Sequence, residues 1–222
     1  MKLLSFMARS VQMGNAPVFF NAIQLDMPID AVYRRLGYRK AHTKVSPEQR
    51  REIDAALADA RSFIELKGSA VILPAEVSPR GEIALGTGDV LRSADLAKML
   101  SGSYKVLLIG ATAGGRIMDE IHRDSREGNL ARAVVLDAAA SEMTDGALGW
   151  LISYIGAQVR REGLEITRRR FSAGYGDFAL ENQKIMYERL RLEEIGVEIT
   201  DACMLVPEKS VTAVAGIRKR NP

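Results

Sequence analysis

The order of helical and β-type patterns along the chain constrains its fold most. Three stretches have the periodicity or end signals of helices: residues 28–37, 46–64 and 130–160. Three short β-type segments crowd together late in the chain: VEIT (197–200), CMLV (203–206) and SVTAVAGI (210–217). Only residues 105–126 have the strand, turn and helix order of a βα unit. Such grouping predicts an α+β fold rather than a doubly wound parallel sheet.

The helix that begins at Pro47 has the clearest local signature. Ser46 is its expected N-cap, Pro47 takes the first helical position, and Gln49 completes a capping box. Apolar residues then recur on one face, at Ile53, Leu57, Ala60 and Ile64.

Further elements follow from the same kinds of pattern. The predicted strands are 68–77, 82–86, 105–109 and 165–172, and the predicted helices are 93–100 and 178–194, the last ended by Gly196. Glycines at 146, 149 and 156 either break the helix over 130–160 or allow close packing there.

Length and composition exclude several classes of protein. With 222 residues and no repeat or linker, the chain is expected to form a single domain over residues 25–222, preceded by an N-terminal extension, residues 1–24. A net charge of +3 is too small to predict nucleic-acid binding. The longest apolar run, residues 146–157, is too short to predict a membrane span.

The cysteine and histidine content predicts no metal site. Cys203 is the single cysteine, and its apolar neighbours predict a buried, unreactive thiol in a strand. The two histidines are far apart in sequence, and no zinc-type spacing occurs. These features together favour a location in the reducing cytoplasm.

The stretch RRRFSAGYGDF, residues 168–178, concentrates charge beside flexible backbone. If ITRRRF is a strand, Arg168 and Arg170 share one face and Arg169 lies on the other. A solvated sheet edge would explain the arginines. Alternatively, a guanidinium binds a carboxylate, while Gly174 and Tyr175 offer close backbone approach and a ring face.

The second interpretation predicts a small zwitterionic or nucleoside ligand. Asp177 is then expected to cap the helix that starts at Phe178, rather than to touch the ligand.

A second glycine-containing turn, LLIGATAGGR, follows a predicted strand and opens a helix. That position suits a phosphate-binding turn. The spacing of Gly110, Gly114 and Gly115 matches neither the dinucleotide-binding nor the Walker pattern, so a close helix–strand contact is favoured.

The C-terminal third resembles the activation domain of cobalamin-dependent methionine synthase. The resemblance rests on Arg170-x-x-x-Gly174-Tyr175, followed by GDFALENQ, a helix, IGVEIT, a methionine and PEKSVTAVAGI. It is best over residues 160–217 and looser from about residue 25. It implies a mainly antiparallel twisted sheet flanked by helices.

The resemblance also implies a set of ligand contacts. Arg170 would hold the carboxylate of S-adenosylmethionine, and the backbone near Ser172 and Ala173 would contact the adenosine, beside Gly174. Tyr175 would lie near the sulfonium. An acidic contact on the preceding helix would come from Glu142 or Asp145.

The implied function is the reductive reactivation of cobalamin. The chain has no Asp-x-His-x-x-Gly cobalamin motif, so it would act in trans on a methionine synthase or other corrinoid protein, with a flavodoxin-like electron donor. It would be a component of that methyltransferase rather than an independent catalyst. The rivals are a docking module of the same fold without ligand binding, a nucleotide-binding enzyme using Gly110–Gly115, and a chaperone that binds the corrinoid itself.

Overall fold

The structure of the protein is a computed structural model, and it describes residues 15–39, 43 and 45–220. The strands are β1 (Val18–Phe20), β2 (Lys67–Val77), β3 (Glu82–Leu85), β4 (Val90–Arg92), β5 (Lys105–Thr112), β6 (Leu164–Ile166), β7 (Glu198–Ile199), β8 (Leu205–Val206) and β9 (Ser210–Lys219). The helices are α1 (Ile29–Arg35), α2 (Pro47–Phe63), α3 (Ala94–Met99), α4 (Gly115–Glu127), α5 (Leu130–Arg161), α6 (Asn182–Leu190) and the 3₁₀ helix η1 (Leu192–Ile195). Within the part of the chain described, no helix is both long and apolar enough to cross a bilayer.

The seven-stranded sheet is antiparallel at every pairing between its strands. Its order is β4-β3-β2-β5-β9-β6, and β1 pairs with β2 on the edge that also receives β3. Strands β7 and β8 form a separate antiparallel pair. The α+β architecture expected from the sequence is confirmed.

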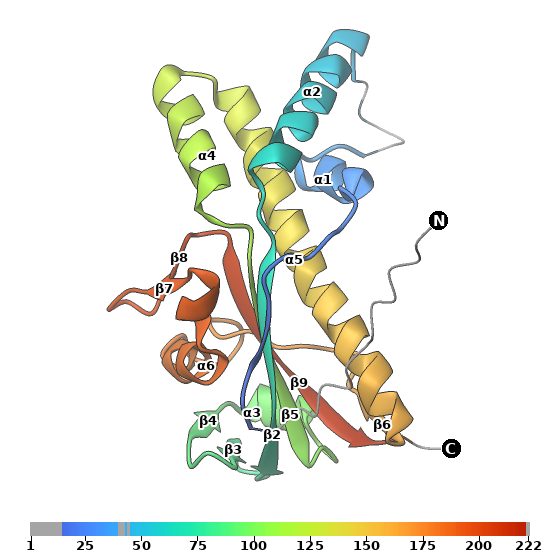
Figure 1. Ribbon diagram of the computed structural model, residues 1–222, viewed down its shortest axis with the longest axis vertical. Coiled ribbons are helices and arrows are strands. Elements are labelled where there is room, and N and C mark those ends of the chain that lie inside the picture. Colours follow the sequence, from blue (N-terminus) through green and yellow to red (C-terminus); the bar gives the residue numbers. More distant parts are fainter. Residues whose placement is uncertain (1–14, 40–42, 44, 221–222) are drawn as a thin grey trace, which may run out of the picture.

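Helices cover both faces of the sheet (Figure 1). Side chains of β5 alternate between the two cores: Leu107 and Ile109 join the core beneath α1, α2, α4 and α5, whereas Val106 and Leu108 join the core beneath α3, α6 and η1. Burial of both faces explains why this strand reads as a continuous apolar run.

The capping box of α2 is present as predicted. Ser46 Oγ accepts a hydrogen bond from the Gln49 amide at 3.1 Å, and the Gln49 side chain accepts one from the Ser46 amide at 3.0 Å. Three of the four predicted apolar positions are buried on this helix; Ile64 follows it in an extended conformation.

Of the two alternatives for the glycines of the long helix, a break does not occur. Helix α5 runs through Gly146, Gly149 and Gly156 for 32 residues. A Cβ at Gly146 would lie 3.4 Å from Leu25, and one at Gly156 would lie 3.6 Å from Ile166. Two of the three glycines therefore let other segments pack closely against the helix.

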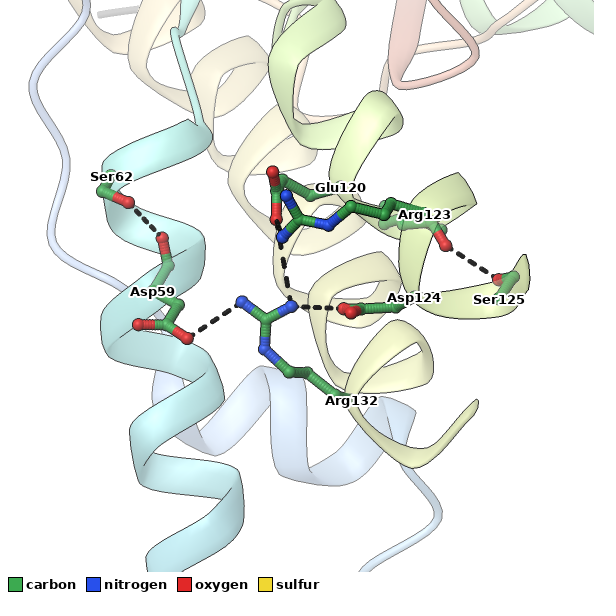
Figure 2. A network of polar contacts seen from close by, with 8 residues as sticks. Asp59, Ser62, Glu120, Arg123, Asp124, Ser125 and Arg132 are labelled. Atoms are coloured by element: carbon green, nitrogen blue, oxygen red, sulfur yellow. Dashed lines mark hydrogen bonds and ion pairs between the residues drawn. The ribbon is translucent and has the colours of Figure 1, made fainter. Parts of the chain in front are cut away.

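A charged network ties the ends of three helices together, as Figure 2 shows. Arg132 of α5 contacts Asp124 and, at 3.9 Å, Glu120 of α4, and it donates to Asp59 of α2 at 2.9 Å. The Asp124 side chain is 3% exposed. The hydrogen bond to Asp59, with that to Asp124, raises the pKa of Arg132 above its ordinary range, so this cation persists at any physiological pH.

The N-terminal part of the chain contributes to the sheet. Within the predicted extension, residues 15–24 include β1, which pairs with β2, and Ile23, which is buried in the core. Residues 1–14 lie outside the described residues. Neither β1 nor β4 was predicted, because three residues are too few to give a clear alternation.

Candidate functional site

Of the strand predicted over residues 165–172, only Glu165 and Ile166 lie in β6, and the chain leaves the strand from Thr167 onward. The Thr167 amide donates to the Gly216 carbonyl, and Phe171 pairs with Val214. Between these two contacts the segment after β6 advances by four residues, whereas β9 advances by only two. The surplus residues leave the ladder as in a β-bulge. The prediction of strand alternation for the three arginines is therefore wrong.

The displaced backbone brings Arg170 to helix α5. Its guanidinium donates to the carboxylate of Asp145 and forms an ion pair with it. The Arg170 side chain is 28% exposed and that of Asp145 is 63% exposed. The preceding Arg168 and Arg169 are exposed, and neither forms an ion pair with any residue that the structure describes.

Glu142 has a different partner. It forms an ion pair with Arg35 of α1, with 2.6 Å between Oε1 and Nε. Of the two acidic residues proposed from the sequence, Asp145 is thus the one beside Arg170.

Beyond Arg170 the chain forms a compact turn, residues 172–178, called the signature turn below. Gly174 has φ +87°, and its amide donates to the Phe178 carbonyl at 2.7 Å. Ala173 and Phe178 are buried in the core, whereas Tyr175 is 70% exposed. Ser172 is half-buried, and its carbonyl accepts from the Tyr175 amide at 3.3 Å. The predicted contact residues from Ser172 to Tyr175 therefore share one turn, in which Ala173 is buried and Tyr175 is exposed.

Asp177 does not cap the helix predicted to start at Phe178. That helix, α6, begins at Asn182, and Asp177 instead caps α3. Hydrogen bonds from the Ser93 hydroxyl and from the Ala94 and Asp95 amides hold the pKa of Asp177 below its ordinary value. The carboxylate is consequently ionised at neutral pH.

Sequence reasoning missed Lys209, although it lies within the quoted PEKSV motif. Lys209 Nζ is 2.6 Å from Asp137 Oδ1 and donates to Ser141 Oγ at 3.1 Å. Asp137, Ser141 and Asp145 are spaced four residues apart and share one face of α5. Lys209 and Arg170 therefore meet the same acidic face of this helix.

Two other predictions near the site need correction. Cys203 is buried as expected, but it lies in the turn between β7 and β8 with φ +62°, not in a strand. SVTAVAGI is not a short segment but most of β9, a ten-residue strand inside the sheet.

The rival glycine turn is shaped by packing. Gly110 lies within β5, and a Cβ there would be only 2.7 Å from Leu192 Cδ2 of η1. Gly114 precedes α4, where Glu65 forms an ion pair with Arg116 at 3.0 Å. The arginine in the first turn of α4 is thus already paired with a carboxylate of this chain.

Substituting Gly110→Ala is expected to lower the free energy of unfolding by about 1–3 kcal/mol, because Leu192 is fully packed and must move. Gly149→Ala is a matched control, since nothing lies within 4 Å of its Cβ position. In helix α5 that change should be neutral or stabilising by up to about 1 kcal/mol. Urea unfolding of both variants measures the difference; equal effects would contradict the packing role.

A cavity of about 570 Å³ lies elsewhere, against α1 and the start of α2. Its lining includes Tyr33, Arg34 and Arg50 but no residue of the signature turn. This cavity is therefore not at the signature turn.

Comparison with known proteins identifies a similar fold. No protein-family model matches the chain, and no curated protein matches its sequence. Among solved structures, the fold is similar to a crystal structure of the MetH reactivation domain bound to AdoHcy, with a TM-score of 0.62. The two are 12% identical, and the match covers 88% of this chain and 74% of that one. An identity this low shows the shared fold alone.

Proposed function

We propose that this protein is an S-adenosylmethionine-binding activation module that acts in trans on a cobalamin-dependent methionine synthase or a related corrinoid protein. The proposal combines the Arg170-x-x-x-Gly174-Tyr175 signature with a fold similar to that of a reactivation domain crystallised with AdoHcy. A partner would supply the cobalamin, and a flavodoxin-like protein would supply the electron.

The pairing of Arg170 with Asp145 carries this proposal. A guanidinium and a carboxylate side by side are complementary to the carboxylate and ammonium of a methionine moiety. Both side chains are partly exposed, so the ligand can exchange one internal ion pair for two external ones. The residues present therefore fit the amino-acid end of S-adenosylmethionine.

The remaining signature residues fit the rest of the ligand. The exposed ring of Tyr175 offers a face that attracts a sulfonium cation. The backbone at Ser172, Ala173 and Gly174 would contact the adenosine. The bound ligand supplies the methyl group, and these residues hold that group towards a partner's corrinoid, so that orientation supplies much of the rate.

The rival docking module also has an observation in its favour. Arg170 already has a charged partner in Asp145, and such a pair can act as a structural tie between the signature segment and α5. In that case the fold would dock on the corrinoid protein without binding S-adenosylmethionine.

Calorimetric titration of the purified chain with S-adenosylmethionine separates these functions, and we expect saturable binding near one ligand per chain. A parallel titration with ATP tests the Gly110–Gly115 rival and should give no saturable heat. Absence of S-adenosylmethionine binding, both alone and with an added corrinoid protein, would exclude the proposed function and leave the docking module and the corrinoid chaperone.

A further inference from the structure

Asp177 joins the signature turn to a helix that lies 84 residues earlier. Its carboxylate accepts hydrogen bonds from the Ser93 hydroxyl, from the Ala94 amide at 2.6 Å and from the Asp95 amide at 3.3 Å. Ser93 Oγ also accepts from the Leu96 amide at 2.8 Å, as an ordinary N-cap. The side chains of Ser93 and Asp177 thus accept hydrogen bonds from the amides in the first turn of α3. Of these two residues, Asp177 belongs to the signature turn.

A second contact seats the same turn against α3. Gly176 has φ +55°, and a Cβ there would lie 2.9 Å from Asp95 Oδ2 and 3.3 Å from the ring of Phe171. Asp95 is exposed and its carboxylate could turn away, so the positive φ is the main reason for a glycine at this position. The turn is therefore anchored to α3 through Asp177 and contacts α3 again at Gly176.

Internal hydrogen bonds and the contacts with α3 act together on the turn, so that loss of the anchor to α3 lets its internal hydrogen bonds open more often. Its shape comes from internal hydrogen bonds, in which the Gly174 amide donates to the Phe178 carbonyl and the Phe178 amide donates to the Tyr175 carbonyl. Its orientation is fixed by the buried side chains of Ala173 and Phe178 and by the contacts with α3. Tyr175 projects from the turn into solvent, two residues before Asp177.

We infer that Asp177 is a positioning residue, which orients Gly174 and Tyr175 for the ligand by anchoring the signature turn to the N-terminus of α3. The identity of the ligand, S-adenosylmethionine, rests on the proposed function. The effect of Asp177 on the turn does not, because it follows from contacts within the protein.

The test compares Asp177→Ala with Asp201→Ala, an exposed aspartate whose side chain forms no hydrogen bond or ion pair with any described residue. Two readouts are used: hydrogen exchange of the Gly174 and Phe178 amides, and calorimetric titration with S-adenosylmethionine. We expect Asp177→Ala to accelerate exchange of both amides and to weaken binding by about tenfold, the effect of losing charge-assisted hydrogen bonds. Asp201→Ala should change neither.

Two further variants separate positioning from a general loss of stability. Asp177→Asn keeps one acceptor oxygen and should restore part of both readouts. Ser93→Ala weakens the cap of α3 but leaves the amides of Ala94 and Asp95 to hold Asp177. It should lower the melting temperature while affinity falls no more than about threefold.

Each outcome of these experiments tests a different claim. Equal exchange rates in Asp177→Ala and Asp201→Ala would overturn the anchoring of the turn. Faster exchange with unchanged affinity would overturn the positioning of the ligand and leave the proposed function intact. If the wild-type chain binds no S-adenosylmethionine, the proposed function fails, and the exchange rates alone decide whether Asp177 orients the turn.

Discussion

Replacing Arg170 with alanine is expected to reduce the affinity for S-adenosylmethionine by about tenfold to a hundredfold. A hydrogen bond to a charged group contributes about 1.5–3 kcal/mol, and loss of the guanidinium leaves the ligand carboxylate without a counter-charge. It also leaves Asp145, 63% exposed, without the contact that holds it beside the signature turn. Calorimetric titration of the variant beside the wild type measures the change.

The matched control for this change is Arg169→Ala, which removes an equal charge from the adjacent, exposed position. Its affinity should stay within about twofold of the wild type, because a screened surface charge contributes little. Arg170→Lys should recover only part of the affinity, since an ammonium cannot form the paired bonds of a guanidinium. Similar losses in Arg169→Ala and Arg170→Ala would mean that general charge, not this contact, attracts the ligand.

Replacing Arg132 with alanine is expected to have the largest effect on stability, lowering the free energy of unfolding by about 3 kcal/mol. The change leaves the carboxylate of Asp124 buried without its arginine partner, whereas Glu120 keeps its contact with Arg123. Asp59 of α2 loses its partner as well, so all three helix ends in Figure 2 lose their common contact. Urea-induced unfolding, followed by circular dichroism, measures the change.

Arg123→Ala provides the control within the same network. Arg123 contacts Glu120 from an exposed position three residues along α4, and its loss should cost less than about 1 kcal/mol. A double substitution, Arg132→Met with Asp124→Leu, should recover part of the stability, since apolar groups can replace a buried pair. Comparable losses from Arg132→Ala and Arg123→Ala would show that the buried carboxylate does not carry the effect.

The sequence predicted the elements whose signals are local. Helix α2 follows from its capping box, and β2 and β5 follow from apolar runs long enough to be distinguished from loops. The α+β class followed from the order of such elements. Whether two strands pair parallel or antiparallel depends on contacts between distant segments. The antiparallel arrangement was therefore expected only from the resemblance.

The errors occurred where a distant partner decides the local conformation. ITRRRF has the alternation of a strand. However, Thr167 and Phe171 bond to residues of β9 that are only two apart, so the residues between them cannot all pair with β9. Asp177 looked like a cap for the next helix because its true partners, at the start of α3, lie more than eighty positions earlier. No local pattern contains that information.

For the acidic contact, by contrast, the resemblance left two alternatives, Glu142 and Asp145. Glu142 and Asp145 are three positions apart on α5, where a helix turns through most of a full circle, and both stay on the same side. Their partners differ because of the tertiary structure: Arg35 of α1 contacts Glu142, whereas Arg170 contacts Asp145. The resemblance supplied the two alternatives, and the tertiary contacts show that Asp145 is the one beside Arg170.

The location of β9 also determines when the protein can assemble during synthesis. This strand follows every other described element along the chain, yet it lies between β5 and β6. Before residues 210–219 leave the ribosome, β5 presents an unpaired apolar edge, and neither β6 nor Phe171 has its strand partner. Nascent chains of this protein would therefore expose an aggregation-prone edge until translation of β9 is complete, which makes chaperone protection valuable at that stage.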